Sequence, residues 1–177
     1  MTDVALLSTV EQAGLIRRGE ISSRELTEHF IERIERLDGE INSVITRDFE
    51  TAVAESDAAD AAQQKGDLMG VLHGVPITVK DALQTKNLKS TGGATELRNN
   101  VPLKDAAVVA SVRREGGIVM GKTNLPRWSG DIQAYNDIFG TTNNPWDISR
   151  GPGGSSGGAA AAVAMGFTSF EIGTDIG

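Results

Sequence analysis

The sequence of 177 residues contains no cysteine and only two histidines, His29 and His73. The absence of cysteine excludes disulfides, thiolate metal sites and a cysteine nucleophile, and two histidines are too few for an all-histidine zinc site. We interpret His29 as a surface or packing residue rather than a catalyst. We therefore expect neither a metal nor a cofactor, and any catalysis must use serine, threonine, lysine or carboxylate side chains.

Basic residues and long hydrophobic runs are also scarce. The chain has 17 Lys and Arg residues against 24 Asp and Glu residues, a formal net charge of -7, which argues against a nucleic-acid surface or an anionic membrane partner. It has no run of about 18 apolar residues that could cross a bilayer, and its first residues include an acid where a signal peptide carries basic residues. We expect a cytoplasmic protein that binds neither nucleic acid directly nor a membrane.

Aromatic residues make up only 5% of the chain, whereas glycine is abundant at 21 residues. The length fits one domain with its own core, and the many glycines indicate backbone positions with special steric requirements. The character of the sequence changes after Gly70. We therefore divide the chain into an N-terminal helical segment, residues 1–69, and a second segment, residues 70–177.

Hydrophobic periodicity and turn residues predict an α/β fold. Ser8-x-x-Glu11 and Ser22-x-x-Glu25 are capping-box patterns, and apolar residues at helical spacing follow each of them. Helices are predicted over residues 23–38, 51–67, 105–117 and 157–164, and strands over 41–48, within 74–85, over 118–124 and from 167 onward. This order predicts N-terminal helices followed by a mixed sheet that includes parallel strands and is covered by helices.

Residues 116–123, GGIVMGKT, match the phosphate-loop pattern G-x-x-x-x-G-K-[ST]. A functional phosphate loop follows a strand and leads into a helix, whereas here a helix precedes Gly116 and Pro126 follows closely. Residues 118–120 are apolar and favour a buried strand. We interpret the segment as a core strand, with residues 121–123 forming the turn that leaves it, and keep nucleotide binding as an alternative.

Lys80 ends the apolar run that begins at Val75, so burial is expected on every side. Burial disfavours the charged form of lysine and lowers its pKa, which makes Lys80 a candidate general base. The alternative is a lysine at a strand end that reaches solvent and pairs with Asp81.

Ser155 and Ser156 lie between two pairs of glycines, Gly153–Gly154 and Gly157–Gly158. Such glycines permit unusual backbone angles and close approach to a ligand. A flexible tether would have polar residues on both sides, but the alanine-rich run 159–164 follows directly. The pattern favours a rigid turn anchored by a helix of small residues.

Five blocks occur in order: GVPITVKD (74–81), GKTNLP (121–126), FGTTNNPWD (139–147), GPGGSSGGAAAAVA (151–164) and GTDIG (173–177). Together they resemble the amidase signature family of serine hydrolases, over about residues 70 to 177. The resemblance implies the N-terminal portion of that family's fold and hydrolysis of a carboxamide by a Ser–Ser–Lys triad. Lys80 would be the base, and Ser155, preceded by a cis peptide bond from Gly154, would be the bridging serine.

In members of that family the nucleophilic serine ends the motif GTDIGGS, so the resemblance places it two residues beyond Gly177. Backbone N–H groups of Ile176 and Gly177 would contribute to an oxyanion hole, while Thr174 and Asp175 would shape the turn. The candidates for lining the acyl pocket are Ser129, Asp131 and Ser156.

The leading hypothesis is the N-terminal portion of an amidase for a small carboxamide, inactive without the downstream serine. One branch of the family makes glutaminyl-tRNA by transamidation with partner subunits, but residues 128–147 are more similar to stand-alone amidases. If the 177 residues are the whole protein, they would form a catalytically silent binding module. The expected partners are the amide substrate and either the remainder of the same polypeptide or a homodimer.

Overall fold

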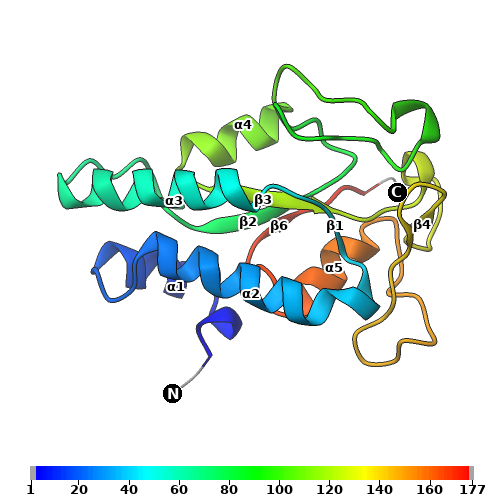
Figure 1. Ribbon diagram of the computed structural model, residues 1–177, viewed down its shortest axis with the longest axis horizontal. Helices are drawn as coiled ribbons and strands as arrows, with labels where there is room; N and C mark the ends of the chain where they lie inside the picture. Colours follow the sequence, from blue (N-terminus) through cyan, green and yellow to red (C-terminus); the bar gives the residue numbers. More distant parts are fainter. Residues whose placement is uncertain (1–2, 176–177) are drawn as a thin grey trace.

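The computed structural model describes residues 3–175, which form a mixed sheet with helices on both sides (Figure 1). In chain order the helices and strands are η1 (Val4–Leu6), α1 (Thr9–Arg17), α2 (Ser23–Ile41), β1 (Val44–Arg47), α3 (Phe49–Gln64), β2 (Pro76–Lys80), η2 (Thr95–Leu97), α4 (Ala107–Arg114), β3 (Ile118–Thr123), η3 (Arg127–Ser129), β4 (Tyr135–Asn136), β5 (Gly140–Thr141), α5 (Gly157–Ala164) and β6 (Glu171–Ile172). The predicted α/β class, with a mixed sheet covered by helices, is confirmed.

The main sheet has the strand order β1-β3-β2-β6. β2 is parallel to both β3 and β6, and β1 is antiparallel to β3. β2 and β3 are buried along their whole length, as expected for parallel strands with helices on both faces. The sheet therefore includes β1 from the N-terminal segment, while the division at residue 70 stays a prediction.

The N-termini of α1 and α2 carry the capping boxes that the sequence predicts. The Ser8 and Ser22 side chains accept from the backbone N–H groups of Glu11 and Glu25, and both glutamate carboxylates accept from the serine N–H groups in return. Each box satisfies two backbone donors that the first helical turn leaves unpaired. Local sequence thus determines where both helices begin.

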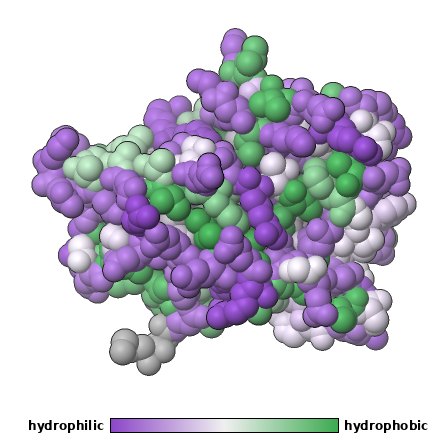
Figure 2. Space-filling view, viewed as in Figure 1, coloured by the Kyte–Doolittle hydropathy of each residue, from purple (hydrophilic) through white to green (hydrophobic). Residues whose placement is uncertain are grey.

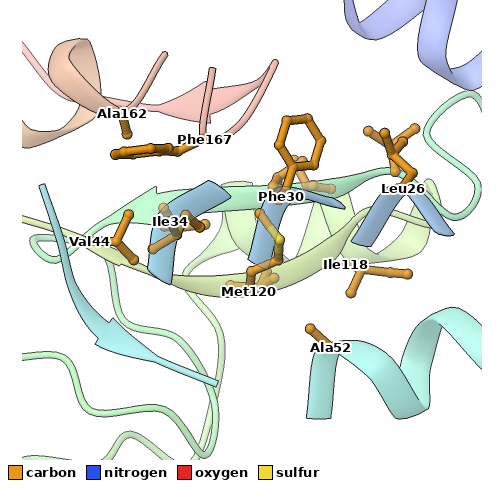
Figure 3. Close-up of a cluster of buried hydrophobic side chains, with 14 of the residues drawn as sticks. Leu26, Phe30, Ile34, Val44, Ala52, Ile118, Met120, Ala162 and Phe167 are labelled. Carbon is orange, nitrogen blue, oxygen red and sulfur yellow. The ribbon is translucent and has the colours of Figure 1, made fainter. Parts of the chain in front are cut away.

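The hydrophobic core joins α2 to the strands. Leu26, Phe30 and Ile34 of α2 are fully buried, and Figure 3 shows them clustered with Met120 of β3 and with Phe167. Burial of one such side chain contributes about 1.5–3 kcal/mol. This core fixes the helical layer against β2 and β3 and so determines where the ends of these strands lie.

Several element boundaries differ from those predicted. Residues 121–123 continue β3, so the predicted exit turn is wrong; they pair with residues of β1 and β2 instead. The strand predicted from residue 167 onward is reduced to β6, and the strand predicted from residue 41 begins at Val44 because Ile41 ends α2 with a buried side chain. These differences reflect tertiary pairing, which local patterns do not report.

Hydrophilic residues predominate on the face drawn in Figure 2. In Figure 2 hydrophobic residues reach the visible face only in separate patches among hydrophilic ones. His29 lies at the surface, where its Nε2 atom is 2.9 Å from the Asp3 carboxylate. Within residues 3–175 no helix combines the length and the apolar character needed to cross a bilayer.

Helix α5 packs unusually close to the chain that follows β3. The Gly158 N–H donates to the carbonyl of Asn124 at 3.1 Å. A Cβ atom on Gly158 would lie 2.4 Å from the backbone nitrogen of Asn124 and 2.5 Å from its carbonyl oxygen. Only glycine fits here, because these backbone atoms leave no space for a methyl group.

We expect Gly158→Ala to lower the free energy of unfolding by about 1–3 kcal/mol through this overpacking. Gly39→Ala is the matched control, since Gly39 is exposed in α2 and has no atom near its missing Cβ. That control should raise stability by about 0.5–1 kcal/mol. Chemical denaturation measures both, and equal effects of the two substitutions would contradict the close packing.

Candidate active site

Lys80 lies at the carboxyl end of β2, and its side chain is fully buried. Its Nζ atom donates to three hydroxyl groups: Thr174 Oγ1 at 2.6 Å, Ser155 Oγ at 2.7 Å and Ser156 Oγ at 3.0 Å. An ammonium group has three N–H donors, so three acceptors satisfy it completely. The structure therefore brings three predicted site residues, Ser155, Ser156 and Thr174, together around the amine of a fourth, Lys80.

The loop before α5 holds the two serines against the end of β6. The Gly154–Ser155 peptide bond is cis, as the resemblance implies. Ser156 occupies the N-cap position of α5, but its hydroxyl makes no capping hydrogen bond. Instead, that hydroxyl donates to the Thr174 carbonyl at 3.1 Å and accepts from the Thr174 N–H at 3.2 Å. These contacts make the loop a fixed turn rather than a tether.

Burial controls the charge state of Lys80. It lowers the pKa of Lys80 to about 8, and the nearby carboxylates of Asp175 and Glu171 oppose that shift. An amine with this pKa is partly neutral close to physiological pH and can then accept a proton. Lys80 is thus chemically suited to act as a base.

Glu171 is a neighbour of this cluster that sequence reasoning missed. Its carboxylate accepts hydrogen bonds from the hydroxyls of Thr78 and of Thr123, the latter at 2.9 Å. Burial raises the pKa of Glu171 to about 7, and the two hydroxyl donors oppose this shift. The signal in the sequence was an acidic residue inside the otherwise uncharged run FTSFEIG.

The predicted alternative in which Lys80 reaches solvent and pairs with Asp81 is wrong. Asp81 accepts from the hydroxyl of Thr91 at 2.5 Å and from its backbone N–H. Alternate residues of a strand point to opposite faces of the sheet, so the two side chains diverge. Asp81 fixes the chain that follows β2, while Lys80 faces the serines.

Lys122, the lysine of the phosphate-loop pattern, is as fully buried as Lys80 but binds a different part of the chain. Its Nζ atom donates to the carbonyl of Leu83 and to the hydroxyl of Thr85, the latter at 2.7 Å. The segment is a strand and not a loop, so its N–H groups cannot surround a phosphate. The geometry contradicts nucleotide binding at residues 116–123.

The predicted acyl-pocket residues lie beside the serine loop. Asp131 is exposed and lines a cavity of about 290 Å³ together with Trp128 and Tyr135, among others. Ser129 is buried nearby and has a left-handed backbone conformation, with φ of 56°. A Cβ atom on Gly154 would lie 3.0 Å from the Asp131 carbonyl oxygen, so the serine loop packs against the backbone of a residue that lines this cavity.

The remaining predicted residues are not all within the described part of the chain. Thr174 contacts Lys80 directly, and Asp175 acts on it electrostatically. Ile176 and Gly177 lie outside the described residues. Across residues 3–175 no group of three or more His, Asp or Glu side chains is arranged to hold a metal ion.

Comparison with known families bears directly on this cluster. A family model described as Amidase matches residues 25–177. The chain belongs to the amidase signature family. Among curated relatives of this amidase chain, a glutamyl-tRNA(Gln) amidotransferase subunit of Moraxella catarrhalis is 46% identical over 177 residues. The alignment covers 100% of the chain but only 36% of that relative, so the chain spans about a third of its relative's length.

Solved amidase structures share the fold. Fatty acid amide hydrolase matches with a TM-score of 0.93 and 26% identity, covering 98% of this chain and 31% of the other. A bacterial aryl acylamidase of the amidase signature family matches with a TM-score of 0.86 and 31% identity, covering 92% and 34%. Both neighbours act on amides by name, and both are about three times as long as the present chain.

Proposed function

We propose that this protein cleaves the C–N bond of a carboxamide through a Ser–cis-Ser–Lys triad. The observation that carries the proposal is the 2.7 Å contact between Lys80 Nζ and Ser155 Oγ, next to the cis Gly154–Ser155 bond. The third member is a nucleophilic serine, which the family pattern puts just beyond GTDIG. Membership of the amidase signature family supports this reading.

The proposed proton path begins at Lys80. In its neutral form the amine has a lone pair and takes the proton of the Ser155 hydroxyl, which in turn takes the proton of the nucleophilic serine. That serine forms a bond to the amide carbonyl carbon, and the protons return along the same path to the leaving nitrogen as the C–N bond breaks. Water then hydrolyses the ester and releases the acid. A hydroxyl suits the middle position because it donates and accepts at once.

The remaining site residues take supporting parts in this proposal. Ser156 and Thr174 hold Lys80 and link the serine loop to the turn after β6. Asp175 shapes that turn, and the N–H groups of Ile176 and Gly177 stabilise the developing oxyanion. The cavity beside Ser129 and Asp131 receives the acyl part of the substrate.

Two forms of the whole protein are consistent with this chemistry. One is a stand-alone cytoplasmic amidase for a small carboxamide, acting alone or as a homodimer. The other is one component of an amidotransferase, which takes its amide nitrogen from glutamine and works with partner subunits. The 46% identity over the whole chain to a glutamyl-tRNA(Gln) amidotransferase subunit favours the second form. Residues 128–147 taken alone favour the first.

Replacing the base tests the triad. In the full-length protein we expect Lys80→Ala to reduce amide hydrolysis by about 10²–10⁴-fold, the usual contribution of a general base, and Ser155→Ala to do the same. Lys65→Ala, at an exposed lysine, is the matched control. Ammonia release measures the rate, and circular dichroism confirms folding. Turnover by folded Lys80→Ala at the wild-type rate would refute the assignment.

The proposed role of Lys80 predicts that the reaction becomes faster as the pH rises. The reactive form of Lys80 is neutral, and burial lowers the pKa of Lys80 to about 8. We therefore expect kcat/KM for an uncharged amide to rise with pH and to level off above about pH 8. Initial rates from pH 6 to 10 provide the measurement. A rate that falls across this range would mean that the protonated lysine is the active form.

Substrate and partner requirements separate the two forms. A stand-alone amidase releases ammonia from simple amides such as propionamide or benzamide without any other protein. An amidotransferase component instead shows glutamine hydrolysis that increases when its partner subunits are added together with glutamyl-tRNA. Hydrolysis of simple amides at full rate by the isolated protein would exclude the second form.

A further inference from the structure

Glu171 shares one face of the sheet with the lysine of the triad. Glu171 of β6 lies opposite Thr78 of β2, and Lys80 lies opposite Thr123 of β3. Residues two apart on a strand point to the same face, so Thr78 and Lys80 project together. The Glu171 carboxylate accepts hydrogen bonds from the hydroxyls of both threonines, which places it across β2, on the face from which the Lys80 side chain projects.

The two threonine hydroxyls hold this carboxylate as an acceptor. Thr78 and Thr123 are themselves fully buried, so their hydroxyls have no solvent to bond with. The two hydroxyl donors favour the charged form of this carboxylate, but burial outweighs them and leaves the pKa of Glu171 raised to about 7. Glu171 is therefore oriented by side chains of the sheet itself.

Two carboxylates at the end of the sheet near β6 carry the charges that act on Lys80. Asp175 after β6 and, to a smaller extent, Glu171 of β6 act on Lys80, and both favour its ammonium form. Glu171 in turn is acted on by Lys122 as well as by Lys80. Lys122 adjoins Val79 in the sheet register, so it projects to the opposite face, where it holds the chain after β2.

We propose that Glu171 is a positioning residue whose carboxylate, held by Thr78 and Thr123, adds to Asp175 in shifting the protonation equilibrium of Lys80 toward the ammonium form. This inference rests on the proposed function, in which Lys80 is the base of the triad. Burial makes Lys80 lose its proton easily, and each nearby carboxylate helps it to hold a proton for the leaving amine. Above about pH 7, where Glu171 is ionised, its charge favours the ammonium form, so Lys80 can both accept a proton and hold it for the leaving amine.

The test follows the titration of Lys80 directly. In full-length protein labelled at lysine with ¹³Cε, the chemical shift of Lys80 is followed against pH, and Lys80→Ala identifies its signal. Glu171→Gln removes the charge while keeping the shape. We expect it to move the Lys80 midpoint to lower pH by about one pH unit. The kcat/KM profile of the same variant should shift in the same direction.

Two further variants separate charge from structure. Glu115→Gln makes the same chemical change at a glutamate before β3, whose carboxylate accepts from the Val71 N–H, and should leave the midpoint unchanged. Glu171→Asp keeps a carboxylate and should restore most of the wild-type midpoint. If Glu171→Gln does not fold, Thr78→Val weakens the hold on the charged form and should shift the Lys80 midpoint in the same direction by a smaller amount.

An unchanged Lys80 midpoint in Glu171→Gln, or in Thr78→Val if the first does not fold, would overturn the proposal, whatever happens to stability. This outcome is distinct from failure of the proposed function, because the lysine titration does not depend on catalysis. A shifted Lys80 signal in a protein whose Lys80→Ala variant still hydrolyses amides would support the electrostatic role of Glu171 and refute the triad.

Discussion

The burial of one amine, that of Lys80, is the constraint on which the site depends. A buried ammonium group is costly unless its three N–H donors are hydrogen-bonded. Here three hydroxyls accept these bonds, and they come from two segments that lie far from β2 in the sequence. The serine loop and the turn after β6 are therefore held together through the lysine. The same desolvation lowers the pKa of Lys80, so one physical cause both assembles the cluster and favours the neutral form of its amine.

Small residues make this assembly sterically possible. Gly158 lets α5 approach the backbone of Asn124, and Gly154 lets the serine loop pack on the backbone of residues 131–133. With side chains at either position, Ser155 could not reach Lys80 without displacing its support. The abundance of glycine and alanine in this part of the chain is therefore a packing requirement and not a sign of flexibility.

Two fully buried lysines on adjacent strands bind different segments of the chain because their side chains project to opposite faces of the sheet. Lys80 of β2 faces the serine loop, whereas Lys122 of β3 faces the chain that follows β2 and bonds to Leu83 and Thr85. Asp81, bonded to Thr91, belongs with this second network. The alternation of side chains along the strands thus separates the amine that binds the serine loop from the one that stabilises the chain after β2.

The sequence alone determined the capping boxes of α1 and α2, the apolar face of α2, the α/β class and the pairing of Lys80 with Ser155, because local patterns and family motifs record these directly. Only the tertiary structure decided that residues 121–123 continue β3, that Thr174 and Ser156 bind the lysine, and that Glu171 shares its face of the sheet. Those contacts depend on the register between strands that are about 40 to 90 residues apart in the chain. Strand register follows from packing of the whole core, so no local pattern reports it.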